Sequence, residues 1–163
     1  MTRDSSRLPE LGARGGGWVA AQFVLLAAIA LSALVAIGWT GSLKPVGIVV
    51  GIALMALGGV LVVLGGVQLG PSLTPFPAPR PGGEMSVSGV YALTRHPMYG
   101  GGILIALGWS VLFASVVGLV LTLVLAVFFE LKAKREEAWL VDHYPEYAAY
   151  RRRTPRKLLP WVY

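Results

Sequence analysis

The sequence has no cysteine and only two histidines, His96 and His143. The first absence excludes disulfide bonds, thiolate nucleophiles and cysteine-based metal sites. The second leaves too few ligands for a multi-histidine centre, and we expect no metal site. Hydrolytic and phosphate-binding motifs are missing as well: no serine has a G-x-S-x-G setting, and there is no P-loop.

Charged residues are also scarce. They make up 13% of the chain, against 55% hydrophobic residues, whereas soluble domains carry about 25% charged residues. This balance is typical of a multi-pass membrane protein with little material outside the bilayer. We therefore interpret the net charge of +6 as positive residues that set the membrane topology and contact anionic lipid, and we expect no nucleic-acid partner.

Residues 17–68 are expected to form two transmembrane helices after a disordered tail, residues 1–16. The uncharged runs 18–39 and 46–67 each hold 22 residues, enough to cross a core of about 30 Å. A tryptophan at each end of the first run suits interfacial anchoring. A G-x-x-x-G in the second run indicates either close packing inside the monomer, which is the simpler interpretation, or an oligomer interface.

The next apolar run, residues 100–129, is uncharged for 30 residues. One straight helix of that length would measure about 45 Å, too long for the bilayer without a steep tilt. Ser115 and Gly118 lie near its middle. We therefore predict a tight helical hairpin with arms at 100–114 and 117–134.

The distribution of positive charge supports four spans. In that topology the N-terminal tail, the segment 68–99 and the C-terminal part share one side, which holds thirteen lysines and arginines, while the other side holds only Lys44. Three spans would leave no clear bias. The positive-inside rule then predicts that both termini are cytoplasmic.

The segments outside the spans have distinct characters. Five prolines make residues 68–87 irregular, either a stiff strip along a cleft or a surface connection. An amphipathic helix, carrying the pairs Glu130–Lys134 and Lys132–Glu136, should end at Tyr144, which precedes a proline. The aromatic and basic residues that follow suit the membrane surface; they are Tyr147, Tyr150, Arg151, Arg152, Arg153, Arg156 and Trp161.

Two polar clusters lie at the ends of the predicted hairpin, residues 89–102 and 130–137. Ionisable groups at membrane depth indicate a functional site, and we expect the clusters to meet. Glu136 and Glu137 point about 100° apart on a helix, a poor acid–base dyad. A binding role fits these residues better than acid–base catalysis. A carboxylate can bind a diol or a cation, arginine and histidine can bind an anion, and tyrosines can pack against a flat ring. A nucleoside-containing cofactor has all these features.

The motifs in these clusters resemble a known enzyme group. R-H-P-M-Y-G after G-V-Y, then K-x-x-x-E-E-x-x-L and Y-x-x-Y-R-x-x-x-P, are similar to the isoprenylcysteine carboxyl methyltransferases and phospholipid N-methyltransferases. The resemblance covers roughly residues 69–157. It implies that residues 69–163 form the core of an integral-membrane methyltransferase that uses S-adenosylmethionine and a lipophilic acceptor.

The resemblance also implies site residues. The cofactor would be bordered by the G-x-Y tyrosine, the H-P-x-Y segment, the first glutamate of the E-E pair and the strip before G-x-Y. These are Tyr91, His96, Pro97, Met98, Tyr99, Glu136, Met85 and Ser86. We add the neighbouring Arg95 and Glu137 as candidate cofactor-binding residues. Arg95 could equally be an interfacial anchor. Prenylcysteine enzymes have an arginine facing the substrate carboxylate where this chain has Lys132, which lacks the planar fork of arginine.

Two other functions fit parts of the pattern. An NADPH-dependent membrane reductase of the sterol type carries a similar R-H-P-x-Y element, but such chains usually have more spans. A non-catalytic membrane scaffold would explain the charge bias but not the clustered histidine, tyrosines and glutamates. The sequence does not identify the methyl acceptor or the oligomeric state.

Overall fold

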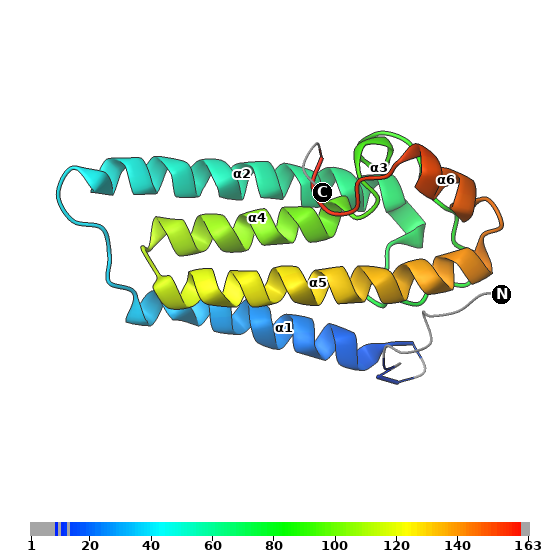
Figure 1. Ribbon diagram of the computed structural model, residues 1–163, viewed down its shortest axis with the longest axis horizontal. Coiled ribbons are helices and arrows are strands. Elements are labelled where there is room, and N and C mark those ends of the chain that lie inside the picture. The colour runs from blue at the N-terminus through cyan, green and yellow to red at the C-terminus, as the bar shows by residue number, and fades with distance from the viewer. Residues whose placement is uncertain (1–8, 10, 13, 161–163) are drawn as a thin grey trace.

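The computed structural model describes residues 9, 11–12 and 14–160, and in those residues every regular element is a helix. Four long helices run antiparallel to their neighbours (Figure 1). They are α1 (Gly16–Leu31), α2 (Leu43–Leu69), α4 (Pro97–Leu112) and α5 (Val116–His143), joined by the short helices η2 (Ser32–Val35), η3 (Gly70–Ser72), α3 (Val90–Leu93) and α6 (Tyr147–Arg153). The all-α prediction is confirmed, whereas the predicted tail, residues 1–16, lies mostly outside the described residues.

Three segments are long and apolar enough to cross a membrane: Gly16–Val35, Leu43–Ser72 and Val116–His143. The fourth apolar helix, α4, has 16 residues and reaches about 24 Å, short of a core of about 30 Å. The chain is therefore a multi-pass membrane protein. As predicted, the first arm of the hairpin is short, but the second arm, α5, extends beyond the predicted residue 134 to His143 and is long enough to span the membrane.

The predicted hairpin is formed by α4 and α5. Its turn is tight because Ala114 adopts a positive φ of 52° and Ser115 N donates to Ser110 O at 2.8 Å. The Ser115 hydroxyl then accepts from Gly118 N at 3.0 Å and caps α5. Beyond its apolar half, α5 continues without a break through the charged cluster and ends at His143, as the following Tyr144–Pro145 pair predicts.

Glycines at seven-residue spacing bring α2 and α4 into close contact. A Cβ on Gly58 would lie 2.5 Å from Gly101 O, and one on Gly51 would lie 2.8 Å from Gly108 O. Small residues let helix backbones approach, and van der Waals packing then holds the pair in lipid. In this fold the buried glycines of α2, which are Gly47, Gly51, Gly58 and Gly65, pack inside the monomer.

The first span is shorter than predicted. It ends at Val35, and Trp39 lies in the following loop, where it packs against Gly47 and donates to Val111 O. Trp18 is only 5% exposed and lies 5.5 Å from Phe128, ring to ring. The Trp18 ring is therefore buried against α5, and its interfacial anchoring stays a prediction.

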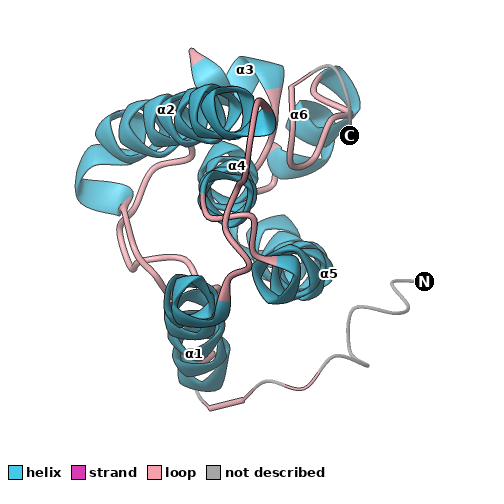
Figure 2. Ribbon diagram, turned by 90° about the vertical axis from the view of Figure 1, so that its left-hand side faces the viewer, coloured by secondary structure: helices cyan, strands magenta, loops and turns pink. Residues whose placement is uncertain are grey.

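The two ends of the bundle differ. One end carries only the α1–α2 connection and the α4–α5 turn; at the other, the proline-rich segment (residues 71–88), α3 and α6 gather (Figure 1). Seen end-on, α4 lies between α2 and α5, with α1 beside α5 (Figure 2). The long helices thus form a bundle with a largely apolar surface, and most of the polar side chains lie at one end of it.

Candidate functional site

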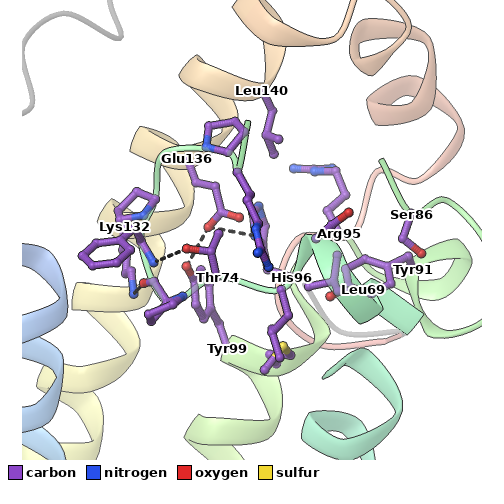
Figure 3. Close-up of a pocket in the computed structure, with 18 of the residues that line it drawn as sticks. Leu69, Thr74, Ser86, Tyr91, Arg95, His96, Tyr99, Lys132, Glu136 and Leu140 are labelled. Atoms are coloured by element: carbon purple, nitrogen blue, oxygen red, sulfur yellow. Dashed lines mark hydrogen bonds and ion pairs between the residues drawn. The ribbon is translucent and has the colours of Figure 1, made fainter. Parts of the chain in front are cut away.

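A cavity of about 560 Å³ opens at the polar end of the bundle. Its walls come from α1, α2, α4, α5 and α6 and from the proline-rich segment, which lies along the cavity as a stiff strip. Nine of the residues expected at the site line it: Met85, Ser86, Tyr91, Arg95, His96, Met98, Tyr99, Lys132 and Glu136 (Figure 3). Pro97 and Glu137 lie outside the lining.

The R-H-P segment is fixed where α4 begins. His96 has a non-helical backbone, with φ −126° and ψ 63°, and Pro97 starts the helix, a position where its missing N–H is not needed. The N–H groups of Arg95 and His96 donate to Arg156 O (3.1 Å) and Lys157 O (2.8 Å). The C-terminal segment thus holds the motif from behind and directs both side chains toward the cavity.

The two polar clusters meet, as the sequence predicts, at Tyr99 and Glu136. The Tyr99 hydroxyl donates to Glu136 Oε2 at 2.6 Å. The Tyr99 ring stacks within 9° of parallel on His96 and on Phe129, at 5.4 and 4.8 Å. Glu136 keeps 25% of its side chain exposed. A fixed, partly accessible carboxylate therefore faces the cavity beside a stack of flat rings.

The neighbouring Glu137 has a different environment. Its Oε1 accepts from Arg95 Nε at 2.8 Å and lies 3.2 Å from His96 Nε2. Arg95 also donates through Nη1 to Thr154 O and Pro155 O, at 2.8 and 2.7 Å. Glu137 thus supports the cavity wall from behind and balances the buried charge of Arg95, because a buried ion needs a partner.

Lys132 is buried, at 1% exposure, on the face of α5 that also carries Phe129 and Glu136. Its Nζ donates to Gln22 Oε1 and to Pro75 O and lies 5.2 Å from the centre of the Tyr99 ring. In the predicted Lys132–Glu136 pair, Glu136 is close enough to act on Lys132 electrostatically, but the hydrogen bonds of the Lys132 ammonium go to Gln22 and Pro75. The other predicted pair forms, with Lys134 Nζ 3.3 Å from Glu130 Oε1.

Sequence reasoning placed the tyrosines of α6 at the membrane surface, and this is wrong. Tyr147 and Tyr150 are 1% and 3% exposed, and both line the cavity. Burial raises the pKa of both phenols and of Tyr91 above the usual range, so all three stay protonated. Arg151, Arg152 and Arg153 are exposed as expected; Trp161 lies outside the described residues.

The far part of the cavity is apolar. Leu26 of α1, Val62 of α2 and Ile105 of α4 line it, and Phe129 lines the cavity from α5, one turn before Lys132. Gln22 was also missed as a lining residue, although it is the one amide side chain in the otherwise apolar α1, and a lone polar residue in a membrane helix usually faces the interior. Among the described residues, no three histidine, aspartate or glutamate side chains gather as a metal site.

A family model described as phospholipid methyltransferase matches residues 46–147, more than half of the chain. The chain belongs to this family. Two curated proteins are also similar to it, each 36% identical: the protein-S-isoprenylcysteine O-methyltransferase of Schizosaccharomyces pombe over 93 residues, and the cobalt-zinc-cadmium resistance protein CzcN of Cupriavidus metallidurans over 77 residues. These matches cover 55% and 47% of this chain but only 39% and 36% of the relatives.

The family match and the cavity coincide. Residues 46–147 include most of the lining, from Val62 to Tyr147, and both polar clusters. Among the described residues outside the matched range, those that line the cavity are Gln22 and Leu26 of α1 and Tyr150 of α6. The part that makes this chain a phospholipid methyltransferase family member is therefore the part that builds the cavity.

Proposed function

We propose that this membrane protein transfers a methyl group from S-adenosylmethionine to a lipophilic acceptor. Family membership supports methyl transfer, and one similar protein is itself named as an isoprenylcysteine O-methyltransferase. The observation that carries the proposal is the Tyr99–Glu136 pair, which joins the two motifs at the wall of a single cavity that is polar at one end and apolar at the other.

The residues present suit this cofactor. The cavity volume of about 560 Å³ lies within the range of about 300–1,000 Å³ typical of small-molecule sites. Glu136 offers a carboxylate for a ribose diol or a cationic group, and the Tyr91 and Tyr99 rings favour flat rings and cations. Arg95 lies in the same wall and offers a positive charge for the carboxylate of the amino-acid part.

When bound, the cofactor supplies an electrophilic methyl on a positive sulfonium, whose sulfur keeps the electron pair of the broken C–S bond. The protein's task is then positioning and exclusion of water. The Tyr99 hydrogen bond fixes Glu136 in one orientation, and the proline-rich segment covers the cavity. A carboxylate or thiolate acceptor would need no general base, because it has no proton to lose when it takes up the methyl group.

The apolar part of the cavity is proposed to take the acceptor. Leu26, Val62 and Ile105 belong to helices whose outer surfaces face lipid, so an apolar chain reaching this wall stays out of water. Lys132 stands between the two parts and is proposed to face the acceptor's polar end. The positive-inside rule supports the further proposal that the cavity end, where positive charge gathers, and both termini lie on the cytoplasmic side.

Calorimetric titration with S-adenosylhomocysteine tests the proposal. The full chain in lipid nanodiscs should bind this product with micromolar affinity. Glu136→Gln should weaken binding at least tenfold, whereas Glu146→Gln, a neutralisation at an exposed site on the same end, should leave it unchanged. Binding of NADPH in its place would move the protein to the reductases, and binding of neither ligand would contradict the proposal.

A further inference from the structure

Tyr147 carries a buried hydroxyl that is left without a hydrogen bond. Its side chain is 1% exposed, and among the described residues its Oη has no partner. Buried polar atoms in native proteins nearly always have one, and an exception calls for an explanation. Because Tyr147 lines the cavity, the missing partner can be a ligand.

The other tyrosines of the cavity make the contrast clear. Each of the four donates a hydrogen bond to the protein: Tyr91 to Gly65 O at 3.4 Å, Tyr99 to Glu136 Oε2 at 2.6 Å, Tyr144 to Gly83 O at 2.6 Å and Tyr150 to Tyr91 O at 2.7 Å. Tyr147 and Tyr150 lie on the same helix with ring centres 5.7 Å apart. The Tyr150 hydroxyl is therefore hydrogen-bonded within the protein, whereas the Tyr147 hydroxyl is left to bind a ligand.

The surroundings indicate what Tyr147 would bind. Its pKa is raised by burial and by the nearby carboxylates of Glu137 and Glu136, so the phenol is a proton donor. Arg95 is also close enough to act on it electrostatically. In the described part of the chain, Arg95 commits Nε and Nη1 to Glu137, Thr154 O and Pro155 O, and Nη2 has no partner. Two unused donors thus belong to the same wall.

We propose that Tyr147 and Arg95 Nη2 together bind the carboxylate of the cofactor's amino-acid part, with the Tyr147 hydroxyl donating one hydrogen bond. A carboxylate is the strongest acceptor that such a ligand offers, and a charge-assisted bond is the strongest use of a buried donor. This inference rests on the proposed function and assigns one group of the ligand to one end of the cavity. Glu136, which lies across His96 from Arg95 (Figure 3), is left for the cationic or ribose part.

Tyr147→Phe, with Tyr150→Phe as its matched control, tests the inference. Tyr147→Phe removes a hydroxyl that makes no bond within the protein, so thermal stability without ligand should be unchanged or higher. Affinity for S-adenosylhomocysteine should fall about 10- to 100-fold, the value of a hydrogen bond to a charged group. Tyr150→Phe should have the opposite pattern. It should lower the thermal stability, because Tyr91 O loses its hydrogen-bond donor, and it should change the affinity for S-adenosylhomocysteine less.

A second ligand tests the carboxylate assignment. Decarboxylated S-adenosylhomocysteine lacks only that group, and Tyr147→Phe should bind it as well as the wild type does. Equal losses for both ligands, or no loss for S-adenosylhomocysteine, would overturn the inference while leaving the proposed function intact. Absence of S-adenosylhomocysteine binding by the wild type would overturn both.

Discussion

Tyr99 and Glu136 meet across the interface between α4 and α5, with the tyrosine hydroxyl 2.6 Å from Glu136 Oε2. This contact joins the R-H-P-x-Y motif at the start of one hairpin arm to the E-E motif near the end of the other. Because the hairpin turn lies at the opposite end of the bundle, both arms must be in register for the two residues to touch. The site therefore depends on the hairpin.

A double-mutant cycle should show this dependence. Tyr99→Phe leaves the Glu136 carboxylate without its donor, and Glu136→Gln removes the charge. Each should weaken S-adenosylhomocysteine binding about 10-fold or more. The double variant should be little worse than either single one, because both remove the same unit. Fully additive losses in calorimetric titrations would mean that the two residues act separately.

Glu137 should matter more for stability than its neighbour. Its side chain and that of Arg95 are 9% and 7% exposed, and removing one partner of a buried ion pair costs about 3–5 kcal/mol. Glu137→Gln should therefore lower the thermal unfolding temperature in detergent clearly. Glu136→Gln is the control and should leave it nearly unchanged, since its carboxylate is 25% exposed. Equal unfolding temperatures would contradict the difference in roles.

The glycine contacts between α2 and α4 allow a matched pair of variants. Gly58→Ala would place a Cβ 2.5 Å from Gly101 O, whereas Gly59→Ala meets nothing within 4 Å. Overpacking of this kind costs about 1–3 kcal/mol. We expect Gly58→Ala to lower the unfolding temperature and Gly59→Ala to keep or slightly raise it. The same loss in both would indicate a general sensitivity of α2 to alanine.

Alkaline pH should destabilise the fold through the buried phenols. Burial raises the pKa of Tyr91, Tyr147 and Tyr150, while an unfolded tyrosine ionises near pH 10. Below about pH 10 both states are protonated, so this contribution to stability is fully present. Above it the unfolded state loses protons that the folded state keeps, and stability falls as pH rises.

Absorbance at 295 nm, which reports phenolate, measures this directly. Tyr91, Tyr147 and Tyr150 should ionise only together with loss of helical structure. Their ionisation near pH 10 in a protein that remains folded would contradict the burial of these side chains.

The sequence predicts the main features of this fold for physical reasons. Uncharged runs of fixed length identify the membrane helices, and the length of residues 100–129 requires a hairpin. The meeting of the two polar clusters follows from the hairpin, because its ends lie side by side. The motifs then identify the family, which the family comparison confirms.

Other features depend on contacts between distant segments and cannot be predicted in this way. The seven-residue glycine spacing predicts a helix contact only once α2 and α4 are known to be neighbours. Tyr147 and Tyr150 stand beside three exposed arginines and look like surface residues. They are buried because the segment after α6 returns to Arg95, a contact across about 60 residues of sequence that no local pattern indicates.

Transfer of a labelled methyl group tests the central claim most directly. The full chain in nanodiscs would be incubated with S-adenosylmethionine carrying a tritiated methyl and with a total membrane lipid extract, and the organic phase would be counted. We predict that the wild type moves label into the organic phase and that Glu136→Gln leaves it at background. Label that stays in the aqueous phase with every lipid extract, in a protein that binds S-adenosylhomocysteine, would contradict a lipophilic acceptor.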